Sequence, residues 1–178
     1  MNTGERLWTP AESEFFAEQE IVEIVPNFRG AKMHFISGSF GPFKPAKPVN
    51  VPLWLAVYLK QRKRCDIQMP TWLDVDFLKK VRAEDKANGQ QFSPALPYYY
   101  NEVAQLLLHE CLEEIPNHQQ LKSVLEDIQE QRKDKLSKVL KQIEGETPVK
   151  FLSNCGSNEV QTHRAVYQAS YGVVNRIQ

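Results

Sequence analysis

Few side chains in this sequence have the types and spacing that metal chemistry requires. His109 and Cys111 are both zinc-ligand types, but residues two apart on a helix point to different faces and cannot share one ion. The four histidines of the chain form no metal-binding pair at helical spacing. We therefore expect no metal site and no bound cofactor.

Candidates for covalent and acid–base catalysis are equally sparse. Cys111 lies within an apolar stripe, where a thiol is a small core residue rather than the nucleophile of a cysteine-dependent hydrolase. Glu110, Glu113 and Glu114 have no histidine or arginine in phase, so they are expected to form a solvated acidic face. The run Gly38-Ser39-Phe40-Gly41 lacks the lysine and hydroxyl that hold a nucleotide and magnesium. The sequence predicts no catalytic residues, no enzyme and no small-molecule substrate.

Charge is balanced over the 178 residues, with 22 bases and 22 acids, but it is unevenly distributed. Residues 24–65 contain eight cations and no acid, which marks a candidate electropositive face. This basic block is either a solvated surface balanced by the acidic first helix or a docking surface. A stand-alone nucleic-acid-binding module that uses the block is the alternative function. The candidates for docking to an acidic partner or to DNA are its last cations, Lys60, Arg62, Lys63 and Arg64.

The first elements that position these residues are expected to be a short helix and a β-hairpin. Thr9 and Glu12 have the spacing of a capping box, so a helix begins there and runs to about Gln19. Residues 21–26 and 31–37 are rich in β-branched and aromatic side chains, and Arg29-Gly30 between them supplies a turn.

Residues 53–64 predict a buried helix. Its first seven positions are apolar without a break, and its last turn carries the four docking cations. A membrane span needs about 20 such residues, so the run is buried in protein and no membrane contact is expected. Three widely spaced cysteines and no N-terminal apolar signal segment predict an intracellular protein with reduced thiols.

The remainder of the chain has helical patterning throughout. Asp74 caps a helix, the segment 98–114 carries an apolar stripe wider than one packing surface needs, and Asn117 begins the longest helix. A last helix is expected from about Asn158 to Val174. The predicted fold class is α+β, mainly α. It has a small N-terminal β-rich domain (1–64) with an N-terminal helix and a buried linking helix, followed by a helical-bundle domain (65–178) of about four helices.

The wide apolar stripes suggest subunit interfaces as well as a core. Arg132 interrupts the stripe of the longest helix, so its guanidinium either reaches water or forms an ion pair across an interface. The candidate subunit-interface residues are Tyr98, Tyr99, Val103, Leu107, Leu125, Arg132, Leu136 and Val139.

Short motifs in a fixed order give a resemblance to a known family over about residues 14–172. The motifs are Glu23-Ile24-Val25-Pro26-Asn27-Phe28, Gly38-Ser39-Phe40-Gly41-Pro42-Phe43, Pro52-Leu53-Trp54-Leu55-Ala56 with Leu59-Lys60-Gln61-Arg62, Trp72-Leu73-Asp74-Val75 after Pro70, and Pro97-Tyr98-Tyr99. Together they resemble the second subunit of the GINS complex of eukaryotic DNA replication.

The resemblance implies a non-catalytic structural subunit located in the nucleus. GINS is a heterotetramer that associates with the MCM motor ring and a further accessory replication-initiation protein, and the assembly is the replicative helicase of initiation and elongation. The implied partners are the three other GINS subunits, the MCM ring with its accessory protein, and DNA through a weak contact. Helical domains are expected to build the tetramer, while ATP hydrolysis belongs to the ring.

Overall fold

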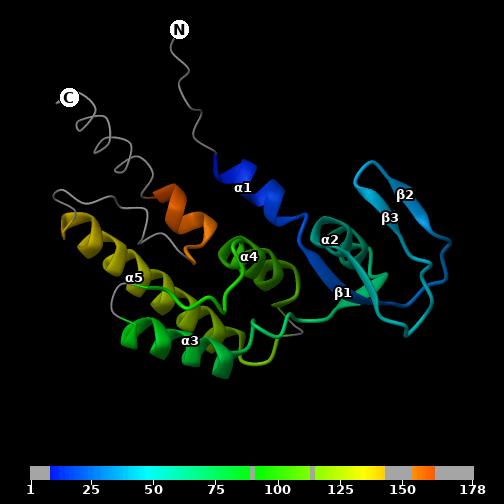
Figure 1. The fold of residues 1–178 in the computed structure, drawn as a ribbon. Coiled ribbons are helices and arrows are strands. Elements are labelled where there is room, and N and C mark those ends of the chain that lie inside the picture. The colour runs from blue at the N-terminus through cyan, green and yellow to red at the C-terminus, as the bar shows by residue number, and fades with distance from the viewer. Residues whose placement is uncertain (1–8, 89–90, 113–114, 143–153, 163–178) are drawn as a thin grey trace, which may run out of the picture.

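The structure is a computed structural model that describes residues 9–88, 91–112, 115–142 and 154–162; the side chains of 139–142 also lie outside the description. A small lobe of strands and short helices is followed by a lobe of longer helices (Figure 1). The elements are α1 (Pro10–Ala17), β1 (Ile21–Pro26), β2 (Met33–Phe35), β3 (Gly38–Phe40), β4 (Val49–Pro52), α2 (Leu53–Gln61), β5 (Cys65–Ile67), α3 (Val75–Ala87), α4 (Tyr100–Glu110) and α5 (His118–Gln142).

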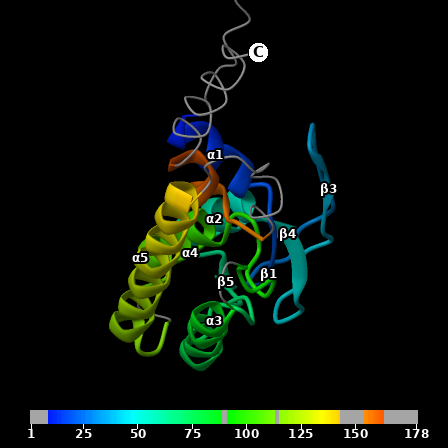
Figure 2. The same ribbon diagram turned by 60° about the vertical axis from the view of Figure 1, so that its left-hand side comes forward.

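The small lobe is built on an antiparallel three-stranded sheet of order β4-β1-β5 (Figure 2). Val22 of β1 lies opposite Val51 of β4, and Ile24 lies opposite Ile67 of β5. Val22 and Ile24 are buried while their neighbours Ile21 and Glu23 are exposed, which is the alternation of a strand with one face on a core. The predicted capping box of α1 is confirmed, because Thr9 and Glu12 bond to each other's backbone N–H groups.

The predicted hairpin between 21–26 and 31–37 is wrong. β1 pairs with β4 and β5, whereas β2 pairs with β3 in a separate two-stranded ribbon. Gly30 does not turn the chain into a hairpin with β1; it forms an isolated bridge with Phe43. The period-two pattern identified the strands but not their partners, since alternation indicates which face is buried and carries no information on pairing.

The predicted buried helix is present as α2, but it ends earlier than expected. Leu53, Leu55 and Leu59 are buried, while Tyr58 is half-exposed, so the helix is not covered on every side. Arg62 is the C-cap and Lys63 has a left-handed φ of 56°, which turns the chain into β5. The four cations therefore do not share the last helical turn. Strand β5 also lies beyond the predicted domain boundary at residue 64 and completes the sheet.

The helical lobe confirms the predicted α+β, mainly α fold class. Asp74 caps α3 by accepting hydrogen bonds from the N–H groups of Asp76 and Phe77, both at 3.1 Å. Leu107 of α4 and Ile128 of α5 are fully buried, and they belong to the same hydrophobic cluster as Ile24 of the sheet. One core therefore runs through both lobes. The predicted last helix is described at 157–162; the rest of it lies outside the described residues.

Arg132 is the largest fully buried side chain of the described residues, and both interpretations offered by the sequence are wrong for it. Its guanidinium neither reaches water nor is exposed to a partner. Nε of Arg132 donates to Asp85 Oδ2 of α3 at 2.5 Å. Nη1 of the same guanidinium donates to Glu159 Oε1 at 3.5 Å. The cation also faces the rings of Phe92 and Tyr100 at 5.0 and 5.5 Å from their centroids. This ion pair lies inside the chain because carboxylates from two other segments meet α5 there.

The carboxylates around Arg132 bind backbone groups as well. Asp85 accepts from the N–H of Ser93 at 2.6 Å, and Glu159 accepts from the N–H of Gly156 at 2.6 Å and from the Tyr100 hydroxyl at 2.6 Å. Burial, followed by the charge of Glu159, raises the pKa of Tyr100, so the phenol stays protonated and donates. The cluster joins α3, α4, α5 and the 154–162 segment.

Removing the central cation should strongly destabilise the fold. For Arg132→Met we expect a loss of about 3 to 5 kcal/mol in the free energy of unfolding, because Asp85 and Glu159 are left buried without a countercharge. Denaturant titration followed by circular dichroism measures it.

The matched control is Lys133→Met on the exposed neighbouring position, which should change stability by less than about 0.5 kcal/mol. The double variant Arg132→Met with Asp85→Asn should recover part of the loss, because one unpaired charge is removed. Equal stability of Arg132→Met and Lys133→Met would contradict a structural role for the buried ion pair.

Candidate subunit interface

Most of the predicted interface residues lie inside the chain's own core. Their side chains are at most 4 % exposed and present no surface to another subunit, which corrects the expectation for these positions: Val103, Leu107, Leu125, Arg132 and Leu136. The apolar stripe of a helix marks the face that is buried, and here the chain itself covers most of that face.

Tyr98 and Tyr99 remain at the surface. Tyr98 is 48 % exposed, Tyr99 is half-buried, and their rings meet edge to face at 4.8 Å between centroids. The carbonyl of Tyr98 accepts a hydrogen bond from the N–H of Ser157 at 2.8 Å, which fixes the backbone ahead of α4. The side chain of Val139 lies outside the described residues.

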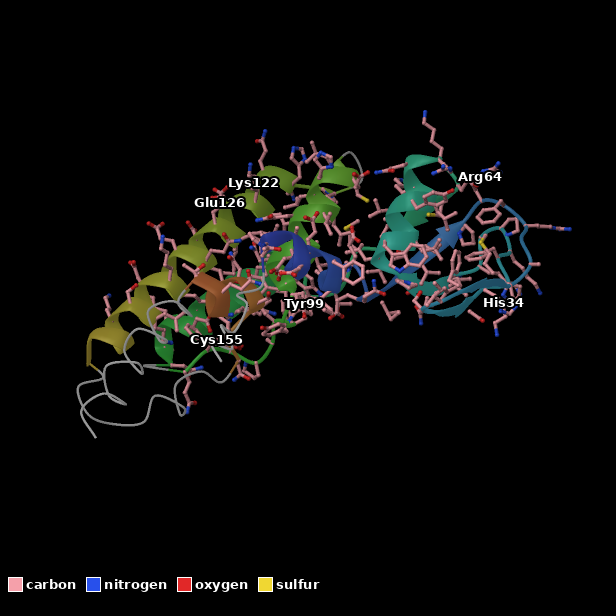
Figure 3. All side chains as sticks on the ribbon, turned by 90° about the horizontal axis from the view of Figure 1, so that it is seen from above. His34, Arg64, Tyr99, Lys122, Glu126 and Cys155 are labelled. Atoms are coloured by element: carbon pink, nitrogen blue, oxygen red, sulfur yellow. The ribbon has the colours of Figure 1, made fainter. Side chains whose placement is uncertain are left out.

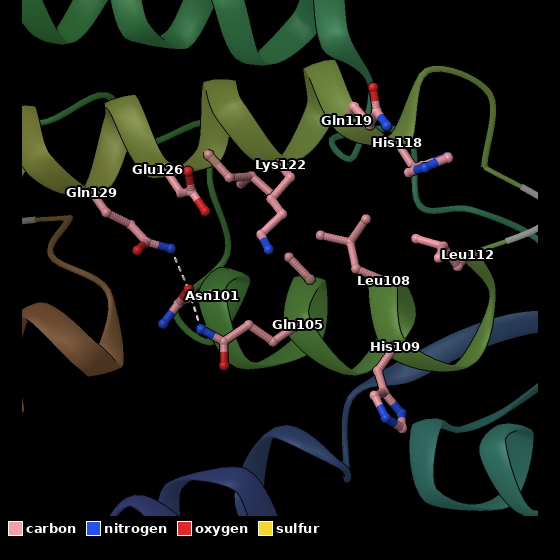
Figure 4. A pocket seen from close by; sticks show the side chains of 12 residues that line it. Asn101, Gln105, Leu108, His109, Leu112, His118, Gln119, Lys122, Glu126 and Gln129 are labelled. Atoms are coloured by element: carbon pink, nitrogen blue, oxygen red, sulfur yellow. Dashed lines mark hydrogen bonds between the residues drawn. The ribbon is translucent and has the colours of Figure 1, made fainter.

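A groove of about 620 Å³ lies between α4 and α5. Leu108 and Leu112 line it from the side of α4, while His118, Lys122 and Glu126 line it along α5 (Figure 4). Leu112 is 46 % exposed, and the floor includes Leu125. The groove thus has an apolar wall and floor with charged groups on the opposite rim, a pattern suited to the apolar stripe of a partner helix.

One end of this groove is closed by an amide cluster. The side-chain oxygen of Asn101 accepts from Gln105 Nε2 at 3.2 Å and from Gln129 Nε2, and both bonds are drawn in Figure 4. Asn101 is itself 6 % exposed, so the cluster satisfies a buried polar group and ties α4 to α5. The width of the groove is therefore fixed by contacts within the chain.

The sequence carried a signal for this groove. Leu108 and Leu112 are four residues apart and belong to the stripe of 98–114 that is wider than one packing surface needs. The prediction chose Leu107 from that stripe, and the structure buries it completely. Periodicity located the surplus of apolar surface but not the side of the helix on which it remains uncovered.

The four candidate docking cations do not act as one set. Lys60 forms an ion pair with Asp66 at 3.2 Å and its side chain is 17 % exposed. Arg62 stacks on the ring of Tyr58 at 3.7 Å, whereas Arg64 extends toward Phe28 on the other side of the turn. Figure 3 shows Arg64 on the small lobe, remote from Lys122 and Glu126 on α5. Lys60 and Lys63, in contrast, line a neighbouring pocket together with His109 and Leu112, which also line the groove. Only Arg64 is therefore clearly separate from the groove.

Comparison with known proteins decides the family. The model of the PSF2 N-terminal domain matches residues 9–68, and that of the GINS complex protein helical bundle domain matches residues 72–177. The chain belongs to the PSF2 family of GINS proteins. The small lobe and the helical lobe of this PSF2-family chain correspond to the two matched regions.

Relatives across animals support the same assignment. The human DNA replication complex GINS protein PSF2 is 42 % identical over 71 % of this chain and 68 % of its own length, and the Xenopus laevis protein of the same name is 40 % identical over the same shares. A Drosophila melanogaster protein named as a probable DNA replication complex GINS protein PSF2 is 33 % identical over 95 % of this chain and 83 % of its own length.

The cysteines of this PSF2-family chain lie in its interior. All three cysteines are free and buried; burial raises the pKa of Cys65 and of Cys155 to about 11 and also raises that of Cys111. Among the described residues, no three histidine, cysteine or carboxylate side chains are grouped to hold a metal ion, and no helix there has the length and apolarity to cross a membrane.

The raised pKa values predict slow thiol labelling in the folded protein. At pH 8 a thiol with a pKa of about 11 holds about 100-fold less thiolate than one at the ordinary 9.0, and burial adds a steric barrier. We expect iodoacetamide to label Cys65 and Cys155 at least about 100-fold more slowly in the folded chain than in urea. Mass spectrometry of peptides measures each site. Rapid labelling of any thiol in the folded chain would contradict this and would favour a cysteine-dependent activity.

Proposed function

We propose that this chain is a non-catalytic structural subunit of a heterotetrameric GINS complex, and that it acts in the nucleus. The proposed complex binds the MCM motor ring and its accessory replication-initiation protein, and the assembly is the replicative DNA helicase of initiation and elongation. The observation that carries the proposal is the match to the PSF2 and GINS family models over both lobes, together with relatives named as GINS proteins of the DNA replication complex.

The placement of the titratable groups supports a structural role. Arg132, Asp85 and Glu159 are the most closely associated charges of the core, and they bind one another and the backbone rather than facing a cleft. Catalysis needs convergent groups that a substrate can reach. In the proposed assembly the motor ring hydrolyses ATP, and this subunit contributes by binding one arrangement of the ring more tightly than another, which shifts its population.

We propose that a helix of a sister subunit binds in the groove between α4 and α5. Leu108 and Leu112 offer apolar surface, and the amide cluster at Asn101 keeps the helices at a fixed spacing. A preformed groove loses little conformational entropy when a partner helix binds it.

The alternative of a stand-alone nucleic-acid-binding module has less support. Base stacking on a single strand needs free aromatic faces beside the cations. The guanidinium of Arg62 lies over the Tyr58 ring at 3.7 Å, and Phe28 stacks on Phe43 with Arg64 above it. These rings are engaged by the chain's own side chains.

Coexpression with three sister GINS subunits tests both the function and the groove. The wild-type chain should appear by native mass spectrometry in a particle with one copy of each subunit. Leu112→Asp should weaken that assembly by about 30-fold, because a charge in a desolvated apolar contact costs at least about 2 kcal/mol. The isolated fold should lose less than about 1 kcal/mol, since Leu112 is already 46 % exposed.

The matched control is Ile36→Asp, which changes an exposed apolar residue on the β2–β3 ribbon away from the groove and should leave the tetramer unchanged. A wild-type chain that stays monomeric beside all three subunits would overturn the proposed function. A tetramer that tolerates Leu112→Asp as well as Ile36→Asp would overturn only the assignment of the groove.

Charge reversal separates assembly of the tetramer from docking to the ring. The variant with Arg62, Lys63 and Arg64 changed to Glu should form the tetramer with unchanged stoichiometry but bind the MCM ring at least about tenfold more weakly. Pull-down of purified tetramer by the ring at two salt concentrations measures the effect. Loss of the tetramer itself in this variant would refute the division between the two surfaces.

A further inference from the structure

An open cleft of about 690 Å³ lies on the small lobe, where the loop after β1 faces the segment ahead of β4. Its lining includes the cations Arg29, Lys44 and Lys47, and the prolines Pro42 and Pro45 lie between them. The predicted docking set did not include these three cations. Arg29, Lys44 and Lys47 are all exposed to solvent.

Backbone contacts hold the two walls of the cleft together. Gly30 and Phe43 exchange backbone hydrogen bonds of 3.0 and 2.9 Å, and the N–H of Ala46 donates to the carbonyl of Pro26 at 3.0 Å. A Cβ atom at position 30 would lie 2.9 Å from the Phe28 ring, so Gly30 lets this ring pack close to the backbone of the wall. The cleft is therefore preformed, and its cations project from a fixed frame.

The charge of the cleft is not balanced locally. Within the part of the chain that the structure describes, Arg29, Lys44 and Lys47 form no ion pair, and the sequence from 24 to 65 contains no acid. Cations gathered along a concave surface reinforce one another's potential and attract a polyanion. A ligand that carries several negative charges in an extended arrangement would satisfy them.

The aromatic residues beside the cleft favour a carboxylate ligand over a nucleic acid. Phe43 is 1 % exposed and stacks on Phe28 at 5.3 Å, while the Arg64 guanidinium lies 6.0 Å from the Phe28 ring. Neither ring offers a free face on which a base could stack. Arginine binds carboxylates through two parallel N–H bonds, and lysine contributes a mobile point charge.

We propose that this cleft binds an extended acidic peptide segment of a partner protein, whose carboxylates pair with Arg29, Lys44 and Lys47. Pro42 and Pro45 give the peptide apolar surface between the charged contacts. The inference goes beyond the proposed function and does not rest on it, because the cleft is formed within the small lobe of one chain.

Fluorescence anisotropy on the 178-residue chain, purified within its complex or alone, tests the proposal. The probe is a fluorescein-labelled peptide of alternating glutamate and serine, and the competitor is an unlabelled thymidine oligonucleotide of equal charge. We expect saturable peptide binding that weakens with salt, and weaker binding of the oligonucleotide. Changing Arg29, Lys44 and Lys47 to Glu should weaken peptide binding at least about tenfold.

The matched control changes three exposed lysines of the helical lobe, Lys80, Lys86 and Lys138, to Glu, which alters the net charge equally. This control should retain the wild-type affinity within about twofold. A neutral variant with Gln at the three cleft positions, checked for an unchanged thermal midpoint, separates loss of contacts from repulsion. Absence of saturable peptide binding, an equal loss in the control, or tighter binding of the oligonucleotide would each overturn the proposal. Loss of the tetramer in the separate coexpression test would leave this result untouched.

Discussion

The buried charge of Arg132 is the interaction on which the helical lobe most depends. A guanidinium removed from water is tolerated only when carboxylates and further hydrogen-bond acceptors replace its hydration. Asp85 and Glu159 supply the negative charge, and the carbonyl of Ser93 accepts a hydrogen bond from Arg132 Nη2 at 3.4 Å. Because these partners come from segments far apart in sequence, the requirement fixes how α3, α5 and the 154–162 segment meet.

Lys135 strengthens the same region from the next turn of α5. Its ammonium donates to the carbonyls of Asp85, Asn88 and Gln91 at 2.7, 2.5 and 2.6 Å, so it binds the backbone where α3 ends and the following loop begins. Burial lowers the pKa of this amine. Together Arg132 and Lys135 hold the end of α3 and the residues after it against α5.

Sequence reasoning succeeded where the signal was local. The capping box at Thr9, the cap at Asp74, the buried helix after Pro52 and the mainly α fold class all follow from short patterns or from family motifs. It failed where the outcome depends on which distant residues pair, or on which face of a helix the rest of the chain covers. Arg132 was recognised as unusual, but its partners are 47 and 27 residues away, and no local pattern indicates which carboxylates will meet it. Five of the eight interface candidates are buried for the same reason, since periodicity marks an apolar face without showing what covers it.

Helix α2 joins the apolar cores of the two lobes. Its buried residues Leu53, Leu55 and Leu59 belong to the cluster that also holds Leu107 and Ile128 of the helical lobe, and α2 directly follows β4 of the sheet. A cut between the lobes would uncover one continuous apolar surface on both fragments. A change of side-chain size on one side of this seam therefore alters the packing on the other, and the two lobes depend on each other for their burial.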